Sequence, residues 1–339
     1  MNALKFTRYT EWWEYKLVPL ISVGYATLLL TNADLKQSIW SLLILMCAIV
    51  TGAVYVSVIN DITDIREDAL AGKPNRMASL SPAVRTSLVC VCLLAGIYFG
   101  SRIYPDKWGL FFYIMAWIVF SLYSLPPFRL KKRGIWGVLC DASGAHLFPT
   151  LLISAHLLYL NYRPIDILWY ISLGVWSLFN GLRGILWHQF YDRANDLRSG
   201  TATFATRLDP ETFKTKALLI TLAELAAFFV VICFVQSVWI WISLGLYSIL
   251  LAIRAFAFKY ETALIIISKT RPYQLLFNDF YLVFFPLALL VNLATADSFG
   301  SYIVFGHLVL FPAKFFLVCK DVVLFIRNSS VLMSFFKKK

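Results

Sequence analysis

Long apolar runs separated by short polar stretches dominate the pattern of this chain. A helix needs about 20 mostly apolar residues to cross the roughly 30 Å hydrocarbon core of a bilayer. We predict nine such runs, at approximately 17–31, 38–59, 84–103, 108–124, 135–158, 165–188, 216–235, 237–256 and 276–295. Because these runs lack the period of two that a barrel strand requires, the pattern predicts an all-α, multi-pass bundle of transmembrane helices.

A further apolar segment follows the ninth run, at 302–319. It contains His307, Pro312 and Lys314, which interrupt its apolar character. The segment therefore has three possible arrangements: it spans the membrane, re-enters it or lies on its surface. A basic tail, Lys337 to Lys339, ends the sequence.

Composition narrows the class of protein further. Of the 339 residues, 60% are hydrophobic and 15% charged, and the mean hydropathy is +0.71, values that exclude a soluble globular enzyme. The net charge of +12 comes from short basic clusters between apolar runs, so it does not indicate a nucleic-acid-binding groove. The six cysteines lie almost entirely in apolar stretches without a CxxC pair and are interpreted as small hydrophobic residues.

The loop charges predict an orientation. The loops after the even-numbered runs are rich in Lys and Arg, whereas the other loops carry few. Cytoplasmic loops of membrane proteins carry this excess of positive charge. We expect the N-terminus and the even-numbered loops to be cytoplasmic, in a bacterial inner membrane. The basic tail would also be cytoplasmic if 302–319 crosses the membrane, which favours ten crossings over nine.

Acidic residues are scarce but clustered at the ends of two of these runs. Of the 19 Asp and Glu residues, four lie within 60–68 and two within 192–196. If the helices continue, Asn60, Asp64 and Asp68 share one face, and Asp192 and Asp196 share another. Carboxylates on one helical face repel each other, and a bound cation would remove this repulsion. A set of oxygen ligands without His or Cys is typical of a Mg²⁺ site. The alternative is that they are solvated charges at the ends of the helices.

Basic residues accompany both acidic clusters and could complement a phosphate group. They are Lys73 and Arg76, with Asn75 beside them, after the first cluster, Arg129 and Lys131 in an intervening loop, and Arg198 and Arg207 after the second. The positive-inside bias also explains basic residues in these loops, so their closeness to the carboxylates is what favours a role in binding.

Three strings in the sequence resemble the UbiA superfamily of membrane prenyltransferases. Asn60-Asp61-x-x-Asp64-x-x-x-Asp68 resembles the first aspartate motif of that family, and Asp192-x-x-x-Asp196 resembles the second. The string at 123–131, YSLPPFRLK, is similar to the YSxPPxRxK segment that follows the fourth helix. The resemblance extends from about residue 10 to about residue 295.

The resemblance implies nine helices around a central cavity that is capped on the cytoplasmic side and opens laterally to the bilayer. It implies a prenyltransferase membrane domain at 1–295 and a C-terminal extension at 296–339. The two motifs would bind two Mg²⁺ ions that bridge an allylic diphosphate. The implied metal ligands are Asn60, Asp64, Asp68, Asp192 and Asp196, with Asp61 on a different face of its helix but within the motif. Arg129 and Lys131 are the implied diphosphate contacts.

Two regions are candidates for binding the acceptor of the prenyl group or removing its proton. His188 lies four residues before Asp192 and would share its helical face, where an imidazole could act as a general base. Asp141 and His146, within a predicted span, are candidates for the acceptor pocket, because ionisable residues in membranes usually face the bundle interior.

The sequence therefore predicts an enzyme that transfers a prenyl group to a small acceptor, with an aromatic acceptor as the default. The alternatives are a non-aromatic sugar- or glycerol-phosphate acceptor, and a terpene cyclase that uses no acceptor. A cation transporter is disfavoured because the acidic clusters lie at the ends of the spans, whereas transporter sites lie near the midplane. We expect a prenyl diphosphate, the acceptor and the lipid bilayer as partners, and no nucleic acid or obligatory protein partner.

Overall fold

The computed structural model describes residues 7–70, 72–164, 166–268 and 270–327. The chain divides into two compact units. The first comprises Met1–Gln236 with Leu264–Ile267, and the second comprises Ser237–Ala263 with Ser268–Lys339.

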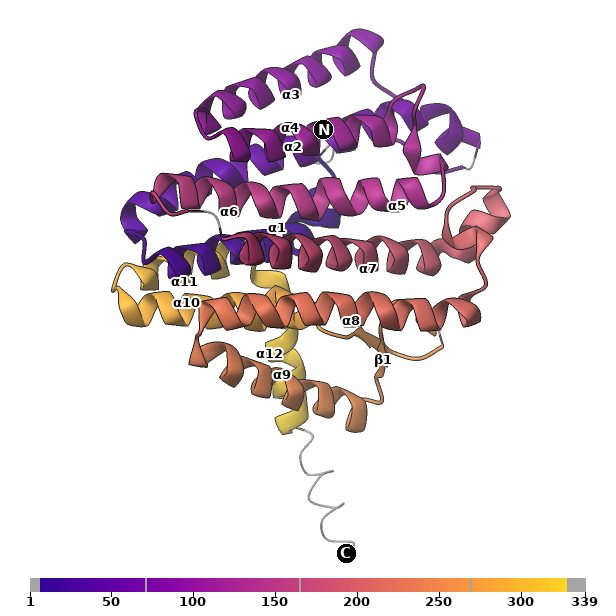
Figure 1. Cartoon of the computed structure of the whole chain (residues 1–339). Helices are drawn as coiled ribbons and strands as arrows, with labels where there is room; N and C mark the ends of the chain where they lie inside the picture. The colour runs from indigo at the N-terminus through magenta and orange to yellow at the C-terminus, as the bar shows by residue number, and fades with distance from the viewer. Residues whose placement is uncertain (1–6, 71, 165, 269, 328–339) are drawn as a thin grey trace, which may run out of the picture. The chain divides into compact units, whose positions relative to one another are not determined.

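Unit 1 is a bundle of long helices, several of which run side by side in Figure 1. Its α-helices are α1 (Tyr9–Thr31), α2 (Leu35–Leu70), α3 (Pro82–Ile103), α4 (Lys107–Ser124), α5 (Ile135–Ala142), α6 (Phe148–Leu160), α7 (Ile167–Ser199) and α8 (Pro210–Val235). The 3₁₀ turns η2 (Leu130–Lys132) and η4 (Ala205–Arg207) lie in its loops, and the π-helical turn η3 (Ser143–Leu147) joins α5 to α6.

Short polar side chains set the beginnings of four helices in unit 1. Ser81, Asp106, Asp166 and Asp209 each accept a hydrogen bond from a backbone N–H in the first turn of α3, α4, α7 and α8. Such caps satisfy N–H groups that have no partner within the helix. The cap residues therefore position the starts of these helices at the chain's turns.

Close helix packing holds α7 at the centre of unit 1, against α5, η3 and α8. At Gly181 a Cβ atom would lie 2.9 Å from Cα of Ala142, so only glycine allows this approach of the two backbones. On the other side, Arg183 of α7 forms two hydrogen bonds with the buried carboxylate of Glu224 on α8. These contacts position the C-terminal half of α7.

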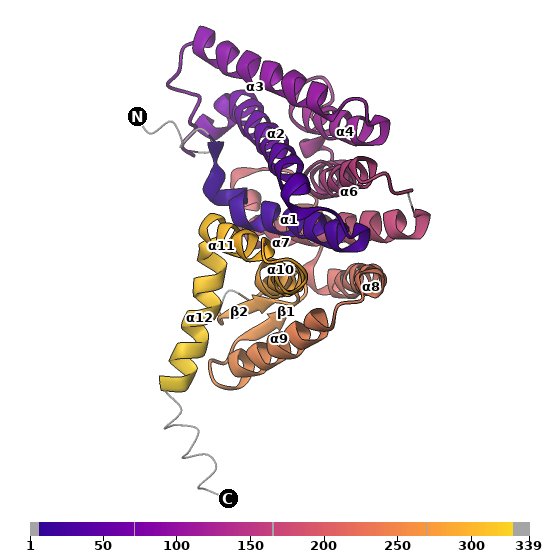
Figure 2. The same cartoon turned by 90° about the vertical axis from the view of Figure 1, so that its left-hand side faces the viewer.

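Unit 2 contains helices and one small sheet (Figure 2). Its elements are α9 (Val238–Phe256), β1 (Glu261–Ala263), β2 (Tyr273–Leu275), the π-helical turn η5 (Phe280–Phe284), α10 (Phe285–Ala296), α11 (Gly300–Leu310) and α12 (Pro312–Arg327). The strands pair in parallel, with Glu261 opposite Tyr273. Strands of three residues are too short to produce a recognisable alternation, and the sequence did not predict them.

The helices agree with the predicted spans. Six segments in the described part of the chain are long and apolar enough to cross a membrane, namely α2, α3, α4, α5 to α6, α8 and α9. Each coincides with one of the nine predicted runs. The other three runs correspond to α1, α7 and the shorter apolar segment Phe280–Ala296, so the prediction of an all-α, multi-pass bundle is confirmed.

Candidate functional site

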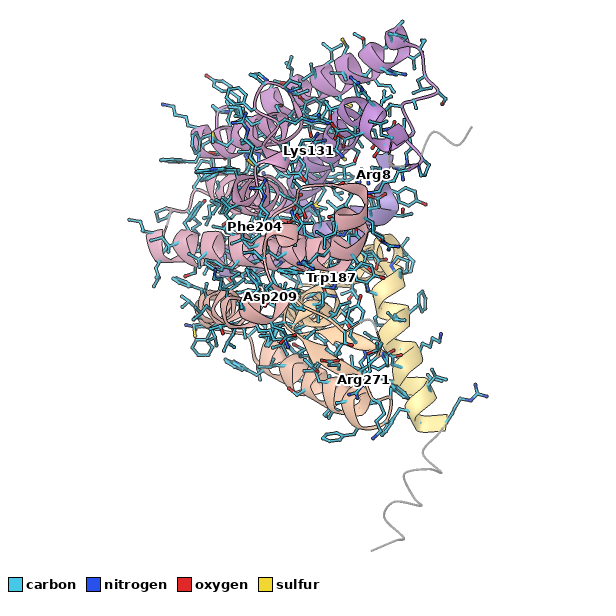
Figure 3. All side chains as sticks on the ribbon, turned by 90° about the vertical axis from the view of Figure 1, so that its right-hand side faces the viewer. Arg8, Lys131, Trp187, Phe204, Asp209 and Arg271 are labelled. Carbon is cyan, nitrogen blue, oxygen red and sulfur yellow. The ribbon has the colours of Figure 1, made fainter. Side chains whose placement is uncertain are left out.

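Two helices extend beyond their apolar parts to carry the acidic motifs. α2 continues to Leu70 and α7 to Ser199, so both acidic clusters are helical, as the spacing predicted. Figure 3 looks onto the end of unit 1 where Lys131, Arg8 and Phe204 lie. The faces of these two helices and the loops after α4 and α7 form the candidate site.

Asp64 is the centre of an ionic cluster on α2. Lys131 donates from Nζ to Oδ1 of Asp64 at 2.6 Å, and Arg129 donates from Nη2 to the same oxygen at 2.7 Å. Lys131 also donates to Oδ1 of Asn60 at 2.8 Å. The structure thus brings together the first acidic motif and the two basic residues of the string at 123–131.

The backbone of the loop after α4 places Arg129 at this cluster. Arg129 has a left-handed conformation with φ 42°, which is costly for a residue with a Cβ. Its guanidinium also bonds Oε1 of Glu67 at 2.7 Å and the carbonyl of Thr63 at 2.8 Å. These hydrogen bonds to one face of α2 offset the backbone strain and fix the direction of the side chain.

Lys131 is held by close packing of its own turn. At Gly137 a Cβ atom would lie 2.9 Å from Cα of Lys131 and 2.8 Å from the carbonyl oxygen of Leu130, so α5 contacts η2 directly. Burial lowers the pKa of the Lys131 ammonium, an effect that the hydrogen bond with Asp64 opposes. Lys131 is therefore a partly desolvated cation that the carboxylate of Asp64 stabilises.

Asp61 lies apart from this cluster. Its carboxylate is 3.3 Å from Nη1 of Arg8 and 3.7 Å from Nη1 of Arg76. Both arginines also pair with Glu11 on α1. Asp61 and Arg76 thus belong to a network that joins α2 to the start of α1, and the structure does not bring either of them to Asp64.

Asp68 and the loop after α2 are joined by one side chain. Asn75 donates from Nδ2 to Oδ2 of Asp68 at 2.7 Å and to the backbone carbonyl of Asp61 at 2.8 Å. Its Oδ1 accepts from the backbone N–H groups of Met77 and Ala78. The loop that contains Lys73 and Arg76 is therefore folded back onto the last turns of α2.

The second acidic motif lies on α7. Nε2 of His188 is 3.8 Å from Oδ2 of Asp192, one turn away, and the His188 side chain is 62% exposed. Asp196 is buried and accepts a hydrogen bond from Oγ1 of Thr203 at 3.3 Å. The predicted shared face of His188 and Asp192 is present.

Two basic residues connect the second motif to the rest of the site. Burial raises the pKa of the Asp196 carboxyl, and the positive charge of Lys73 opposes this effect. The backbone N–H of Lys73 donates to the carbonyl of Asp68 at 2.8 Å, so a loop held at the first motif carries the charge that acts on the second. Arg207 is exposed, and a side chain at Gly134 would begin 3.4 Å from its Nη1, so it reaches the turn between η2 and α5.

The carboxylates do not form a closed metal cage. Among the described residues, no group of three or more His, Cys, Asp or Glu side chains is arranged to hold a metal ion. Mg²⁺ is usually bound by one or two carboxylates together with substrate phosphates and water. The donor set of carboxylates and one amide is therefore compatible with Mg²⁺ that binds together with a phosphate-containing substrate.

An apolar cavity of about 110 Å³ lies in unit 1 beside the first motif. Aromatic side chains on α2 and α4 form much of its wall, and the rings of Tyr55 and Trp117 are 4.7 Å apart. Ser57, three residues before Asn60, also lines it. The ionic cluster and the cavity therefore lie on adjacent turns of α2.

Two charged residues interrupt the apolar wall of the cavity. Lys16 of α1 and Asp141 of α5 both line it, with 3.8 Å between Nζ and Oδ2. His146, predicted as a partner of Asp141, is buried and does not line the cavity. A Cβ atom at Gly181 would lie 2.9 Å from its Cδ2, so the imidazole packs against α7.

Sequence reasoning missed three side chains that hold the site together, namely Arg8, Glu67 and Thr203. Glu67 offered a weak signal, because it lies within the first motif. Arg8 is 53 residues from Asp61 and offered none. Its role depends on the packing of α1 beside α2.

Comparison with known proteins gives a consistent result. Residues 17–264 match the UbiA prenyltransferase family, and the chain belongs to this family. The fold is similar to that of a UbiA homologue from Archaeoglobus fulgidus bound to DMAPP and Mg²⁺, with 16% identity, a TM-score of 0.60 and coverage of 85% of this chain and 96% of that chain. The same homologue bound to GPP and Mg²⁺ has 14% identity and a TM-score of 0.59, and the alignment covers 91% of this chain and 99% of that chain.

A digeranylgeranylglyceryl phosphate synthase is also similar in fold. Its identity is 17%, the TM-score is 0.54, and the alignment covers 86% of this chain and 98% of that chain. No curated protein matches the chain by sequence.

Proposed function

We propose that the protein is an integral membrane prenyltransferase that transfers a prenyl group from an allylic diphosphate to a small acceptor and releases diphosphate. The observation that carries this proposal is the adjacency of the ionic cluster at Asp64 and the apolar cavity beside Tyr55 on one helix. A prenyl diphosphate has the same two parts, a multiply charged head and an apolar chain. The head would bind at the cluster and the chain in the cavity.

The two motifs are proposed to hold Mg²⁺ together with the diphosphate. Asn60, Asp64 and Asp68 would provide ligands on α2, and Asp192 and Asp196 on α7. Support comes from the oxygen donor set and from the Mg²⁺-bound relatives of the same fold. When bound, Mg²⁺ would neutralise the charge that develops on the departing diphosphate.

The basic residues would bind the same head group. Arg129 and Lys131 already lie within 2.7 Å of Asp64, so a diphosphate at this carboxylate would meet both cations. Lys73, which influences Asp196, and the exposed Arg207 would act from the second motif. Arg76 is proposed only to support the loop, because it pairs with Glu11 and lies near Asp61.

The cavity would hold the prenyl chain and exclude water from the allylic carbon. The bond between this carbon and the diphosphate oxygen breaks, and its electron pair leaves with the diphosphate. The faces of Tyr55 and Trp117 would then stabilise the allylic cation. A nucleophilic atom of the acceptor forms the new bond and loses a proton.

We propose an aromatic acceptor that enters the cavity beside Lys16 and Asp141. These two residues place charges on an otherwise apolar wall, where they would orient a polar substituent. His188 is proposed to accept the proton from the acceptor, because it is exposed and lies one turn from Asp192.

We also propose that the site lies on the cytoplasmic side of the membrane. The positive-inside pattern would place the N-terminus and the motif-bearing ends of α2 and α7 on the cytoplasmic side. The charged diphosphate group of the substrate could then reach the site from the cytoplasm, while its prenyl chain enters from the bilayer.

The purified full chain in lipid should be assayed for diphosphate release. Dimethylallyl, geranyl and longer allylic diphosphates would be compared with Mg²⁺ or a chelator, and with or without hydroxylated aromatic acids. Release that requires both Mg²⁺ and an acceptor supports the proposal, and Asp64→Asn should lower it sharply at a Mg²⁺ concentration that is just sufficient for the wild type. Release without an acceptor and with a hydrocarbon product identifies a cyclase, and the absence of release under all conditions rejects both.

A further inference from the structure

The apolar segment after α10 forms two short helices with different directions. α11 ends at Leu310, Phe311 breaks the helix, and α12 begins at Pro312. The 11 residues of α11 extend about 16 Å at 1.5 Å per residue, roughly half of the hydrocarbon thickness. The segment 302–319 is thus not one continuous helix.

α12 crosses the direction of α10 instead of running alongside it. In Figure 1 α10 lies across the view while α12 is upright, and in Figure 2 α10 is seen end-on while α12 is still upright. The sequence predicts that the segment containing α10 spans the membrane, and a helix that crosses its direction lies along the plane of the membrane. This arrangement separates α12 from the spans of unit 2.

A buried ionic contact places α12 at one end of these spans. Arg254, two residues before the end of α9, donates from Nε to Oδ2 of Asp321 on α12 at 2.8 Å. Arg254 also pairs with Asp279, which directly precedes η5. α12 is therefore anchored where α9 ends and the next apolar segment begins, at the level of the loop 257–279.

The outward face of α12 combines apolar and basic side chains. Val318 and Asp321 are buried, and they mark the inward face. The opposite face follows the helical spacing 316, 317, 320, 323, 324 and 327, and its members are the exposed residues Phe316, Leu317, Lys320, Val323, Leu324 and Arg327. Lys and Arg on such a face can extend their charged ends toward water while their stems cover apolar surface.

We propose that α12 lies in the interfacial layer of the membrane and binds anionic phospholipid headgroups through Lys320 and Arg327. Phe316, Leu317, Val323 and Leu324 would contact the upper acyl chains. The loop between α9 and α10 carries further basic residues, including Lys259 and Arg271, so this end of unit 2 is positively charged. Opposite charge favours an anionic lipid surface over a neutral one. The proposal does not depend on the enzymatic activity.

The position of α12 can be measured with nitroxide labels at single cysteines in the full chain, in a background without the native cysteines. The chain would be placed in phosphatidylcholine vesicles containing phosphatidylglycerol, and collisions with oxygen and with a water-soluble nickel complex would report depth. We expect positions 316, 320, 323 and 327 at about the same shallow depth, because they share one face of the helix. A steady change of depth along the helix, or uniform access from water, would reject the proposal.

Lipid selection provides an independent test. Association of spin-labelled phosphatidylglycerol would be compared with that of spin-labelled phosphatidylcholine for the wild type and for Lys320→Gln/Arg327→Gln. We expect the preference for phosphatidylglycerol to fall several-fold in this variant. Arg102→Gln/Lys107→Gln is the control, because it removes two exposed cations around the loop between α3 and α4.

Two outcomes of this test would overturn the assignment. Equal loss of preference in both variants would show that only the total charge of the chain matters. Dipolar broadening between labels at position 316 on two chains would show that a second copy covers the face. Neither double substitution changes a buried side chain, so misfolding is not expected to obscure the comparison.

Discussion

Lys131 and Asp64 are 67 positions apart in the sequence, yet Nζ of the lysine donates to Oδ1 of the aspartate at 2.6 Å. The lysine is also within hydrogen-bond distance of Asn60, so one ammonium group contacts two members of the first motif. Under the proposed function, this group would transfer its interaction to the diphosphate when the substrate binds.

Replacement of Lys131 should therefore reduce activity much more than replacement of its neighbour. Lys131→Met removes a charge directed at the proposed head-group site, and loss of one such donor typically costs about 100-fold in rate. Lys132→Met is the matched control, because Lys132 is half-exposed and contacts Glu67. Diphosphate release by the two variants in lipid measures the difference, and similar activities would remove Lys131 from the site.

Replacement of Asp61 and of Asp64 by asparagine should affect the Mg²⁺ dependence of the rate differently. Asp64→Asn should raise the Mg²⁺ concentration for half-maximal rate by about tenfold or more. Asp61→Asn should leave this concentration nearly unchanged and lower stability by about 1 kcal/mol, because it weakens the contacts with Arg8 and Arg76. A magnesium titration of both variants is the test. A large shift for Asp61→Asn would make Asp61 a metal ligand after all.

The cavity wall should influence which prenyl chain is accepted. Trp117→Ala removes a large ring from the wall and leaves space that the surrounding helices fill only partly. We expect kcat/KM for longer allylic diphosphates to rise relative to that for the five-carbon substrate. Trp108→Ala changes an exposed tryptophan outside the cavity and should leave this ratio unchanged. An unaltered ratio in Trp117→Ala would place the prenyl chain elsewhere.

The ion pair between α7 and α8 should be important for stability. Glu224→Ala leaves the charge of Arg183 buried without this carboxylate, and such changes cost about 3–5 kcal/mol. Glu211→Ala on the same helix is the control, because Glu211 is exposed and its loss should cost less than about 1 kcal/mol. Thermal unfolding in detergent measures both variants, and equal midpoints would contradict the expected role of the buried pair.

Local patterns in the sequence were sufficient to predict the helices and the helical faces of the two motifs. Apolar runs identify spans because every backbone polar group in a bilayer must be satisfied within the helix. A spacing of four residues puts Asn60, Asp64 and Asp68 on one face of any continuous helix, and α2 is continuous to Leu70. The prediction that His188 and Asp192 share a face holds for the same reason.

Only the tertiary structure decided which charged side chains contact each other. The spacing showed that Asp61 lies on another face, but its contact with Arg8 depends on the packing of α1 beside α2. The break at Phe311 follows locally from Pro312, whereas the direction of α12 depends on contacts such as the pairing of Arg254 with Asp321. Contacts between residues far apart in sequence leave no periodic signal, because helix packing and loop conformation determine them, whereas the pattern of one helix depends only on its own residues.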